Sequence, residues 1–263
     1  LDLWLAAVAW GASQVWVLVT DEEAPQYRQA LAEQMAVAQA ILAGLGLAGT
    51  HLRMLEARDA RDLASLDAAL RAEPAAGVAT PATWSAQADK RSTLDLALDH
   101  LLAQASRPPE AIALPAAGSP LGSLQVDTSR CTMCLSCVGA CPSAALADNP
   151  ERPQLRFVER NCVQCGLCVT TCPEQALQLQ PRLWLADDGK ARKQLRVLHE
   201  DQPFHCVSCG KPFGTARAIE SMIAKIGAHP AFAGPNAQRL RMCGDCRVNA
   251  MFSNPDERKI TDY

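Results

Sequence analysis

The first 120 residues alternate between amphipathic stretches and continuously apolar ones. Helical spacing over residues 1–10 leads to the apolar run VWVLV at 15–19, which is typical of a strand buried on both faces. Pro25 opens a long helical pattern that ends near Gly44, and a second strand is expected over 51–55. Alternating helices and apolar strands predict an α/β domain with parallel strands.

Two more helices and a last short strand complete this region. We expect helices over 62–71 and 92–104 and a strand over 111–114. Ser92, followed three residues later by Asp95, is a capping signal for the second of these helices.

The stretch GLGLAG at 44–49 matches the G-x-G-x-x-G dinucleotide fingerprint. That fingerprint works after a strand and before a helix, whereas these glycines follow a helix and precede a strand. We therefore expect them to end the helix in left-handed conformations rather than to cradle a nucleotide.

Composition and charge exclude several classes of protein. The 263 residues carry a formal net charge of −3, so bulk attraction to nucleic acid or to an anionic membrane is not expected. No apolar run reaches the roughly 18 residues that a membrane span needs. The chain begins at Leu1 inside a helical pattern, and we expect further residues before it.

All twelve cysteines follow residue 130, and the first eight form two equal runs, CTMCLSCVGACP from Cys131 and CVQCGLCVTTCP from Cys162. Each run reads C-x2-C-x2-C-x3-C-P, in which three thiolates hold one [4Fe–4S] cluster and the fourth reaches the other. The first cluster is predicted to be held by Cys131, Cys134, Cys137 and Cys172. The second is predicted to be held by Cys162, Cys165, Cys168 and Cys141. Zinc sites use ligands in two pairs instead, so zinc is the weaker alternative for these eight.

The two runs resemble those of bacterial two-cluster ferredoxins at all eight ligands. The resemblance implies a ferredoxin-like α+β domain of order β-α-β-β-α-β and one-electron transfer at low potential. The segment between the runs, 143–161, is longer than in that family. Short strands are expected over 124–126, 155–158 and 177–180.

The last four cysteines, Cys206, Cys209, Cys243 and Cys246, have a different spacing of two plus two. Zinc favours this arrangement, with four thiolates in a closed tetrahedron. A rubredoxin-like iron, a third iron–sulfur cluster and disulfide chemistry remain alternatives. A helix is expected over 215–226 and another after the second pair, and the module resembles zinc-ribbon and treble-clef families.

A hairpin is expected in LWLADDGKARKQLRVL, with Asp188 and Gly189 at its turn. The basic stretch GKARKQLR at 189–196 is expected to be a solvated hairpin face, or a surface that steers an acidic redox partner.

Two wider resemblances concern partners. Over residues 5–70, AVAWGASQVWVLV and GLGLAGTHLRMLEARD resemble the iron–sulfur delta subunit of methyl-viologen-reducing hydrogenases, a family that links hydrogenase or formate dehydrogenase to a heterodisulfide reductase. That family has cysteines directly after the strand that corresponds to 15–19. Residues 20–23 stand there in this chain and include no cysteine, which implies a scaffold without a cluster. The order of the regions is similar to large bacterial 4Fe–4S-binding proteins associated with formate dehydrogenase and other molybdoenzymes.

These observations predict three domains: an α/β scaffold over 1–118, a two-cluster ferredoxin domain over 119–182, and a hairpin with a four-cysteine metal module over 183–263. We find no Ser/His/Asp or Cys/His arrangement, so an electron carrier or electron-transfer subunit is expected rather than an enzyme. An iron–sulfur subunit of a flavin- or molybdenum-dependent oxidoreductase, and an assembly protein with structural clusters, remain alternatives. The cysteine spacing favours metal sites in a reducing compartment, here the cytoplasm.

Overall fold

The computed structural model describes residues 1–232 and 234–253 and divides into two compact units. The first unit contains residues 1–124, 158–165 and 179–194. The second contains residues 125–157 and 166–178 together with the chain from 195 on. Each unit therefore combines segments that lie far apart in the sequence.

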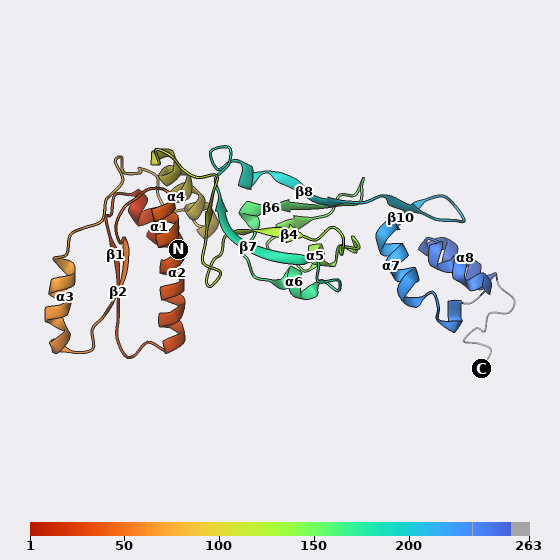
Figure 1. Ribbon diagram of the computed structural model, residues 1–263, viewed down its shortest axis with the longest axis horizontal. Coiled ribbons are helices and arrows are strands. Elements are labelled where there is room, and N and C mark those ends of the chain that lie inside the picture. Colours follow the sequence, from red (N-terminus) through yellow and green to blue (C-terminus); the bar gives the residue numbers. More distant parts are fainter. Residues whose placement is uncertain (233, 254–263) are drawn as a thin grey trace. The chain divides into compact units, whose positions relative to one another are not determined.

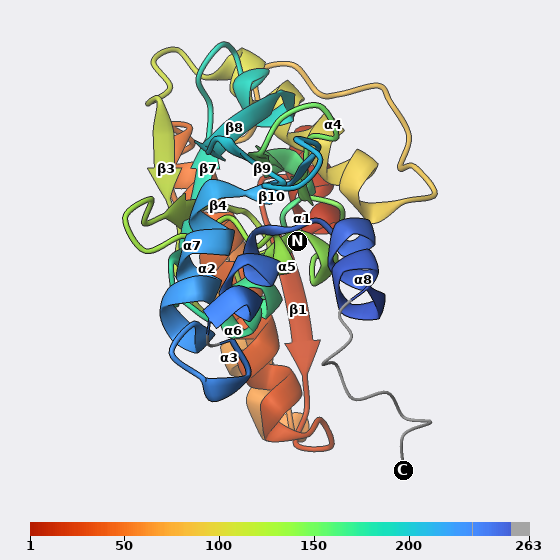
Figure 2. The same ribbon diagram turned by 90° about the vertical axis from the view of Figure 1, so that its right-hand side faces the viewer.

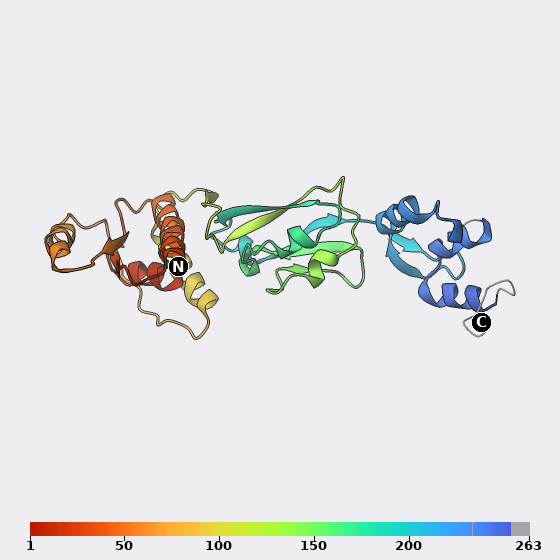
Figure 3. The same cartoon turned by 90° about the horizontal axis from the view of Figure 1, so that it is seen from below.

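The N-terminal part of the first unit is the predicted α/β layer. Its elements in chain order are α1 (Asp2–Ala9), β1 (Val15–Val19), α2 (Pro25–Gly44), β2 (Leu52–Glu56) and α3 (Leu63–Leu70). β1 and β2 pair in parallel, and α2 and α3 lie on opposite sides of the two strands (Figures 1 and 3). The predicted helices and the parallel strand pair are confirmed.

The prediction that VWVLV is buried on both faces is wrong. Only Val19 of this strand is buried, and Leu18 is 59% exposed. The sheet has two strands, and α3 on its outer side has no buried residue, so that face stays partly exposed. The strand predicted to complete the layer, β3 (Ala111–Ala113), pairs antiparallel with β7 in another sheet instead.

The core of this layer lies between its helices. α1 packs against α4 (Lys90–Gln104), and Leu5, Ile41 and Leu101 of three different helices are completely buried in one apolar cluster. Burial of such side chains stabilises the layer by about 1.5–3 kcal/mol each.

The helix α4 begins earlier than Ser92, because Asp89 is its N-cap and accepts hydrogen bonds from the backbone N–H groups of Arg91 and Ser92. Asp95, predicted as a capping residue, is instead buried. It pairs with Arg192 at 2.6 Å and also with Arg160. Arg192 is only 3% exposed, so the prediction of a solvated basic face is wrong at this residue.

The glycines of GLGLAG end α2, as predicted. Gly46 and Gly49 have φ values of 89° and 101°, a region that residues with a side chain rarely adopt. The N–H of Gly46 donates to the Ala43 carbonyl at 3.0 Å and closes the helix end.

The cysteine runs lie between strands in the order β-α-β-β-α-β that the ferredoxin resemblance implied. The elements are β4 (Gly122–Val126), α5 (Ser136–Gly139), β5 (Leu146–Ala147), β6 (Gln154–Val158), α6 (Leu167–Thr171) and β7 (Leu177–Trp184). β4 neighbours β7 in one sheet, and β5 pairs antiparallel with β6 in the other. The chain is thus a mixed α/β protein with a ferredoxin-type strand order.

The predicted hairpin over 183–198 is wrong. β7 lies in the sheet β3–β7–β4, whereas β8 (Leu195–Glu200) lies in the sheet β5–β6–β8. Asp187, Asp188 and Gly189 all have positive φ, and a 3₁₀ turn over Ala191–Lys193 follows. A two-residue hairpin turn cannot accommodate this path, which carries Arg192 into its buried ion pair.

The C-terminal part contains the antiparallel strands β9 (Pro203–His205) and β10 (Pro212–Thr215), followed by α7 (Ala216–Ile226) and α8 (Gly244–Phe252). Figure 2 shows β9 and β10 together, with α7 continuing from β10. The Thr215 hydroxyl accepts a hydrogen bond from the Ala218 N–H and caps α7. Both predicted helices are therefore confirmed. None of the helices in the described part of the chain has the length and apolarity to cross a membrane.

The buried ion pair of Asp95 yields a stability prediction. Asp95→Asn should lower the free energy of unfolding by about 3 to 5 kcal/mol, because buried Arg192 would lose its 2.6 Å carboxylate partner and keep only the 3.3 Å contact to Asp99. Asp99→Asn is the matched control on the same helix, and since Asp99 is 42% exposed it should cost less than about 1 kcal/mol. Urea titration of the anaerobic full chain measures both, and equal losses would contradict the assigned role of burial.

Candidate metal centres

A narrow cavity in the second unit is bounded by cysteines of both runs. Its sulfur-bearing residues are Cys131, Cys134, Cys137 and Cys172, the four that the sequence assigns to the first cluster. Met133, Leu155 and Leu177 also line the cavity, and all three side chains are buried. Four sulfur donors in apolar surroundings suit an iron–sulfur cluster, whose potential depends on this shielding from water.

The thiols of this cavity differ in acidity. Burial, followed by the proximity of Cys131 and Cys134, raises the pKa of the Cys137 thiol to about 12. Cys134 is exposed, and hydrogen bonds from Ser136 outweigh its partial burial and lower its pKa. Because crowded thiolates repel one another, a cation in the cavity would be needed for all four to ionise together.

Three left-handed backbone positions recur at the same places in the two runs. The pairs are Met133 and Gln164 (φ 55° and 54°), Leu135 and Gly166 (59° and 79°), and Ala144 and Gln175 (50° and 48°). Residues other than glycine adopt this region at a cost of about 1–3 kcal/mol, so its repetition indicates a functional constraint. Such turns direct successive N–H groups to one side of the chain, where they can bind an anionic cluster.

The ligands predicted for the second cluster are divided between the units. Cys162 and Cys165 lie in the first unit, and Cys168 and Cys141 lie in the second. Burial would raise the pKa of the Cys141 thiol, but N–H groups that include that of Leu146 outweigh it and lower that pKa. Like Cys134 in the first run, Cys165 is exposed.

A side-chain hydrogen bond distinguishes the second run from the first. The Gln164 amide donates to Cys162 Sγ at 3.2 Å and to the Ser123 carbonyl at 3.1 Å. Its counterpart in the first run, Met133, has no polar hydrogen to donate. A donor to a ligand sulfur stabilises negative charge there, so Gln164 gives the second run a different electrostatic setting. The sequence analysis did not single out Gln164, although this difference between the runs is visible in the sequence.

The four C-terminal cysteines converge in the second unit. The sulfurs of Cys206, Cys209, Cys243 and Cys246 all lie within 4.8 Å of one another. The turn after Cys206 is closed by a 2.8 Å hydrogen bond from the Gly210 N–H to the Cys206 carbonyl, and Gly210 has a positive φ of 74°. Cys243 is the N-cap residue of α8.

Neighbouring groups in this cluster shift the pKa values of Cys206 and Cys246 in opposite directions. Burial would raise the pKa of Cys206, but N–H groups of Cys243, Cys209 and Ser208 outweigh it and lower that pKa to about 6. A hydrogen bond with Ser208 would lower the pKa of Cys246, but the three other thiols raise it to about 12. Four sulfurs this close can all ionise only around a cation, and the set suits either zinc or iron.

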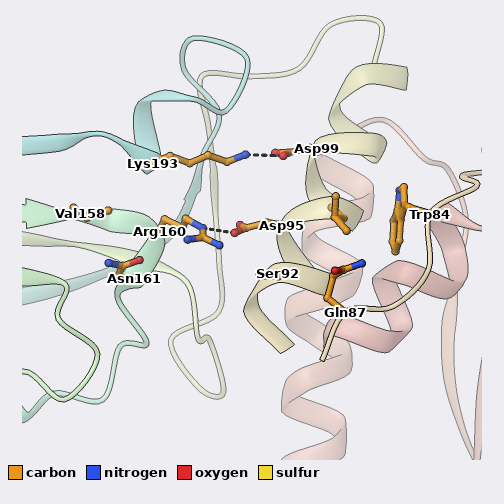
Figure 4. Close-up of a pocket in the computed structure, with 10 residues that line it drawn as sticks. Trp84, Gln87, Ser92, Asp95, Asp99, Val158, Arg160, Asn161 and Lys193 are labelled. Atoms are coloured by element: carbon orange, nitrogen blue, oxygen red, sulfur yellow. Dashed lines mark hydrogen bonds and ion pairs between the residues drawn. The ribbon is translucent and has the colours of Figure 1, made fainter. Parts of the chain in front are cut away.

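A wide cavity in the first unit has a volume of about 900 Å³. Figure 4 shows that its charged side chains face one another in pairs, Asp95 with Arg160 and Asp99 with Lys193. Its described lining residues include neither a histidine nor a cysteine.

Two arginines that the sequence analysis did not single out contact the cysteine runs. Arg91 of α4 donates to the Cys162 carbonyl, and Arg217 of α7 donates to the Cys131 carbonyl. Both contacts join segments more than 70 positions apart, so no local pattern could have predicted them.

Comparison with known families agrees with the cysteine chemistry. Residues 123–173, which include all eight cysteines of the two runs, match a family described as a 4Fe-4S dicluster domain. Residues 161–212 match a second family of the same description, and this match shares the second run with the first. No curated protein matches the chain. The chain therefore carries a ferredoxin-type iron–sulfur domain.

Proposed function

We propose that this protein transfers single electrons at low potential through two [4Fe–4S] clusters, between a donor and an acceptor oxidoreductase. The observation that carries the proposal is the apolar cavity in which Cys172 of the second run lies with three cysteines of the first. In a dicluster ferredoxin the fourth cysteine of each run binds the cluster held by the other run, and this combination matches that arrangement.

The proposed ligands follow the two runs. The first cluster would be held by Cys131, Cys134, Cys137 and Cys172. The second would be held by Cys162, Cys165, Cys168 and Cys141. The clusters supply the one-electron chemistry, and the protein supplies shielding, hydrogen bonds and docking surfaces. The exposed Cys134 and Cys165 give each cluster one edge near solvent, where a partner can approach.

For the four C-terminal cysteines we propose structural zinc. Their two-plus-two spacing and mutual sulfur distances support a closed tetrahedral site. The second dicluster match extends over Cys206 and Cys209, which favours an iron–sulfur cluster as the alternative. However, Cys209 is followed by Gly210, Lys211 and Pro212 rather than by the next cysteines of such a run.

The regions around the clusters would provide docking surfaces for partner proteins. In this proposal residues 1–118 form a scaffold, 119–182 hold the clusters, and 183–263 contain the metal-stabilised module. The resemblances described above support formate dehydrogenase or another molybdoenzyme as a partner, and the reducing cytoplasm as the location. The alternatives are an iron–sulfur subunit within a flavin- or molybdenum-dependent oxidoreductase, which a co-purifying flavin or pterin would indicate, and an assembly protein.

Metal content and redox titration test the main proposal. The anaerobically purified chain should contain about eight iron atoms and about one zinc. Titration followed by EPR should show reversible one-electron reduction of both clusters. Clusters that cannot be reduced at any accessible potential would leave only a structural role.

Single cysteine substitutions test the assignment of the sites. Cys131→Ser should reduce the iron content from about eight to about four atoms, because one ligand of one cluster is lost, and should keep the zinc. Cys246→Ser is the matched variant in the other site and should lose zinc while retaining about eight iron atoms. Loss of iron in Cys246→Ser, or about twelve iron atoms and no zinc in the unchanged protein, would contradict the zinc assignment.

A further inference from the structure

Two arginines from segments on either side of the ferredoxin region hold the two cysteine runs in the same way. Nη2 of Arg91 donates to the carbonyl oxygen of Cys162 at 3.3 Å. Nη1 of Arg217 donates to the carbonyl oxygen of Cys131 at 3.2 Å. Cys131 and Cys162 are the first cysteines of their runs, so the two contacts are equivalent under the internal repeat.

Arg91 is fixed by the first unit. It lies in the first turn of α4, directly after the Asp89 cap, and its side chain is half-buried. The same guanidinium donates to the Pro120 carbonyl at 3.3 Å, so it joins α4, the 115–123 linker and the second run. A side chain held at two carbonyls keeps its charge at a defined place beside Cys162.

Arg217 is fixed by the second unit. It lies in the first turn of α7 and donates to the Thr128 carbonyl as well as to that of Cys131. α7 is held at the first run by the Thr215 hydroxyl, which donates to the Met133 carbonyl at 3.4 Å. Lys225 at the other end of α7 pairs with Glu174, a residue that lines the cysteine cavity.

Neither guanidinium is neutralised by a carboxylate. Within the described residues Arg91 and Arg217 donate to backbone carbonyls and form no ion pair, unlike the neighbouring Arg160 and Arg192. A guanidinium stays protonated under all ordinary conditions. Asp95 lies near enough to Arg91 to interact with it electrostatically, and the Asp201 carboxylate accepts a hydrogen bond from the Arg217 backbone N–H, but neither guanidinium forms an ion pair among the described residues. Each run therefore has a guanidinium charge beside its first cysteine, and such a charge favours the reduced, more negative state of a cluster.

We propose that Arg91 and Arg217 set reduction potentials, each raising the potential of the cluster whose run begins at Cys162 or Cys131, respectively. The inference rests on the proposed function only in requiring that the two clusters are present. Arg91 is half-buried and Arg217 is exposed, so the effect of Arg91 is the larger and that of Arg217 is more strongly screened by salt.

The test compares Arg91→Gln and Arg217→Gln with the charge-retaining Arg91→Lys and Arg217→Lys. Arg71→Gln, which removes an exposed arginine at the C-cap of α3, is the matched control. Iron content is measured for the full chain first, and the two midpoint potentials are then determined by anaerobic titration with EPR at low and high salt.

Each Gln variant should lower one midpoint potential, and the two variants should lower different ones. At a fixed potential the ratio of oxidised to reduced cluster should rise about threefold to tenfold, where tenfold corresponds to about 59 mV for one electron. The Lys variants should retain most of the original potential, the Arg71→Gln control should retain all of it, and high salt should diminish the Arg217 shift more than the Arg91 shift.

Three results would overturn the inference. Unchanged potentials in both Gln variants at full iron content would show that the contacts are structural only. A shift of the same midpoint by both variants would contradict the pairing of one arginine with one cluster. Loss of iron from the Gln variants, with full iron content in the Lys variants and the control, would indicate that the arginines serve cluster assembly instead. Absence of iron from the unchanged protein would instead refute the proposed function itself.

Discussion

The crowding of cysteine sulfurs governs much of this structure, because thiolates packed together repel one another and at least one thiol of each group resists ionisation. Burial and neighbouring thiols raise the pKa of Cys137 to about 12, and neighbouring thiols raise that of Cys246 to about 12. A bound cation removes this repulsion, so metal binding and folding of these loops are coupled. Metal binding also offsets the strain of the left-handed turns at Met133 and Gln164, because a metal group that binds their N–H groups stabilises the turns.

The segments around the cysteine runs act on them through a few charged contacts. Asp95 of α4 binds Arg160, which lies two residues before Cys162, and Arg192, which lies beyond β7. This buried group joins the helical layer to both segments, and Arg91 forms no ion pair among the described residues. In the second unit, α7 approaches the first run through Arg217 and follows directly from the strand after Cys206 and Cys209. The four-cysteine module thereby supports the helix that contacts the first run.

The two runs are equal in spacing but not in surroundings. Gln164 donates to a ligand sulfur of the second run, whereas Met133 at the same place in the first run is buried and apolar. Arg91 is half-buried beside Cys162, and Arg217 is exposed beside Cys131. Two clusters with the same ligands would therefore experience different fields, which is a physical basis for unequal potentials.

The sequence by itself determined the elements with strong local signals: the helices, the parallel pair β1–β2, the β-α-β-β-α-β order, and the two patterns of cysteine spacing. It failed at the 183–198 hairpin, at the burial of VWVLV on both faces and at Asp95. In each case the outcome depends on partners remote in the chain, such as Arg192 for Asp95. Only the tertiary structure brought Arg91 and Arg217 to the cysteine runs. Spacing fixes which thiols can share a metal, because that geometry is local, whereas the charges that tune a metal come from wherever the fold places them.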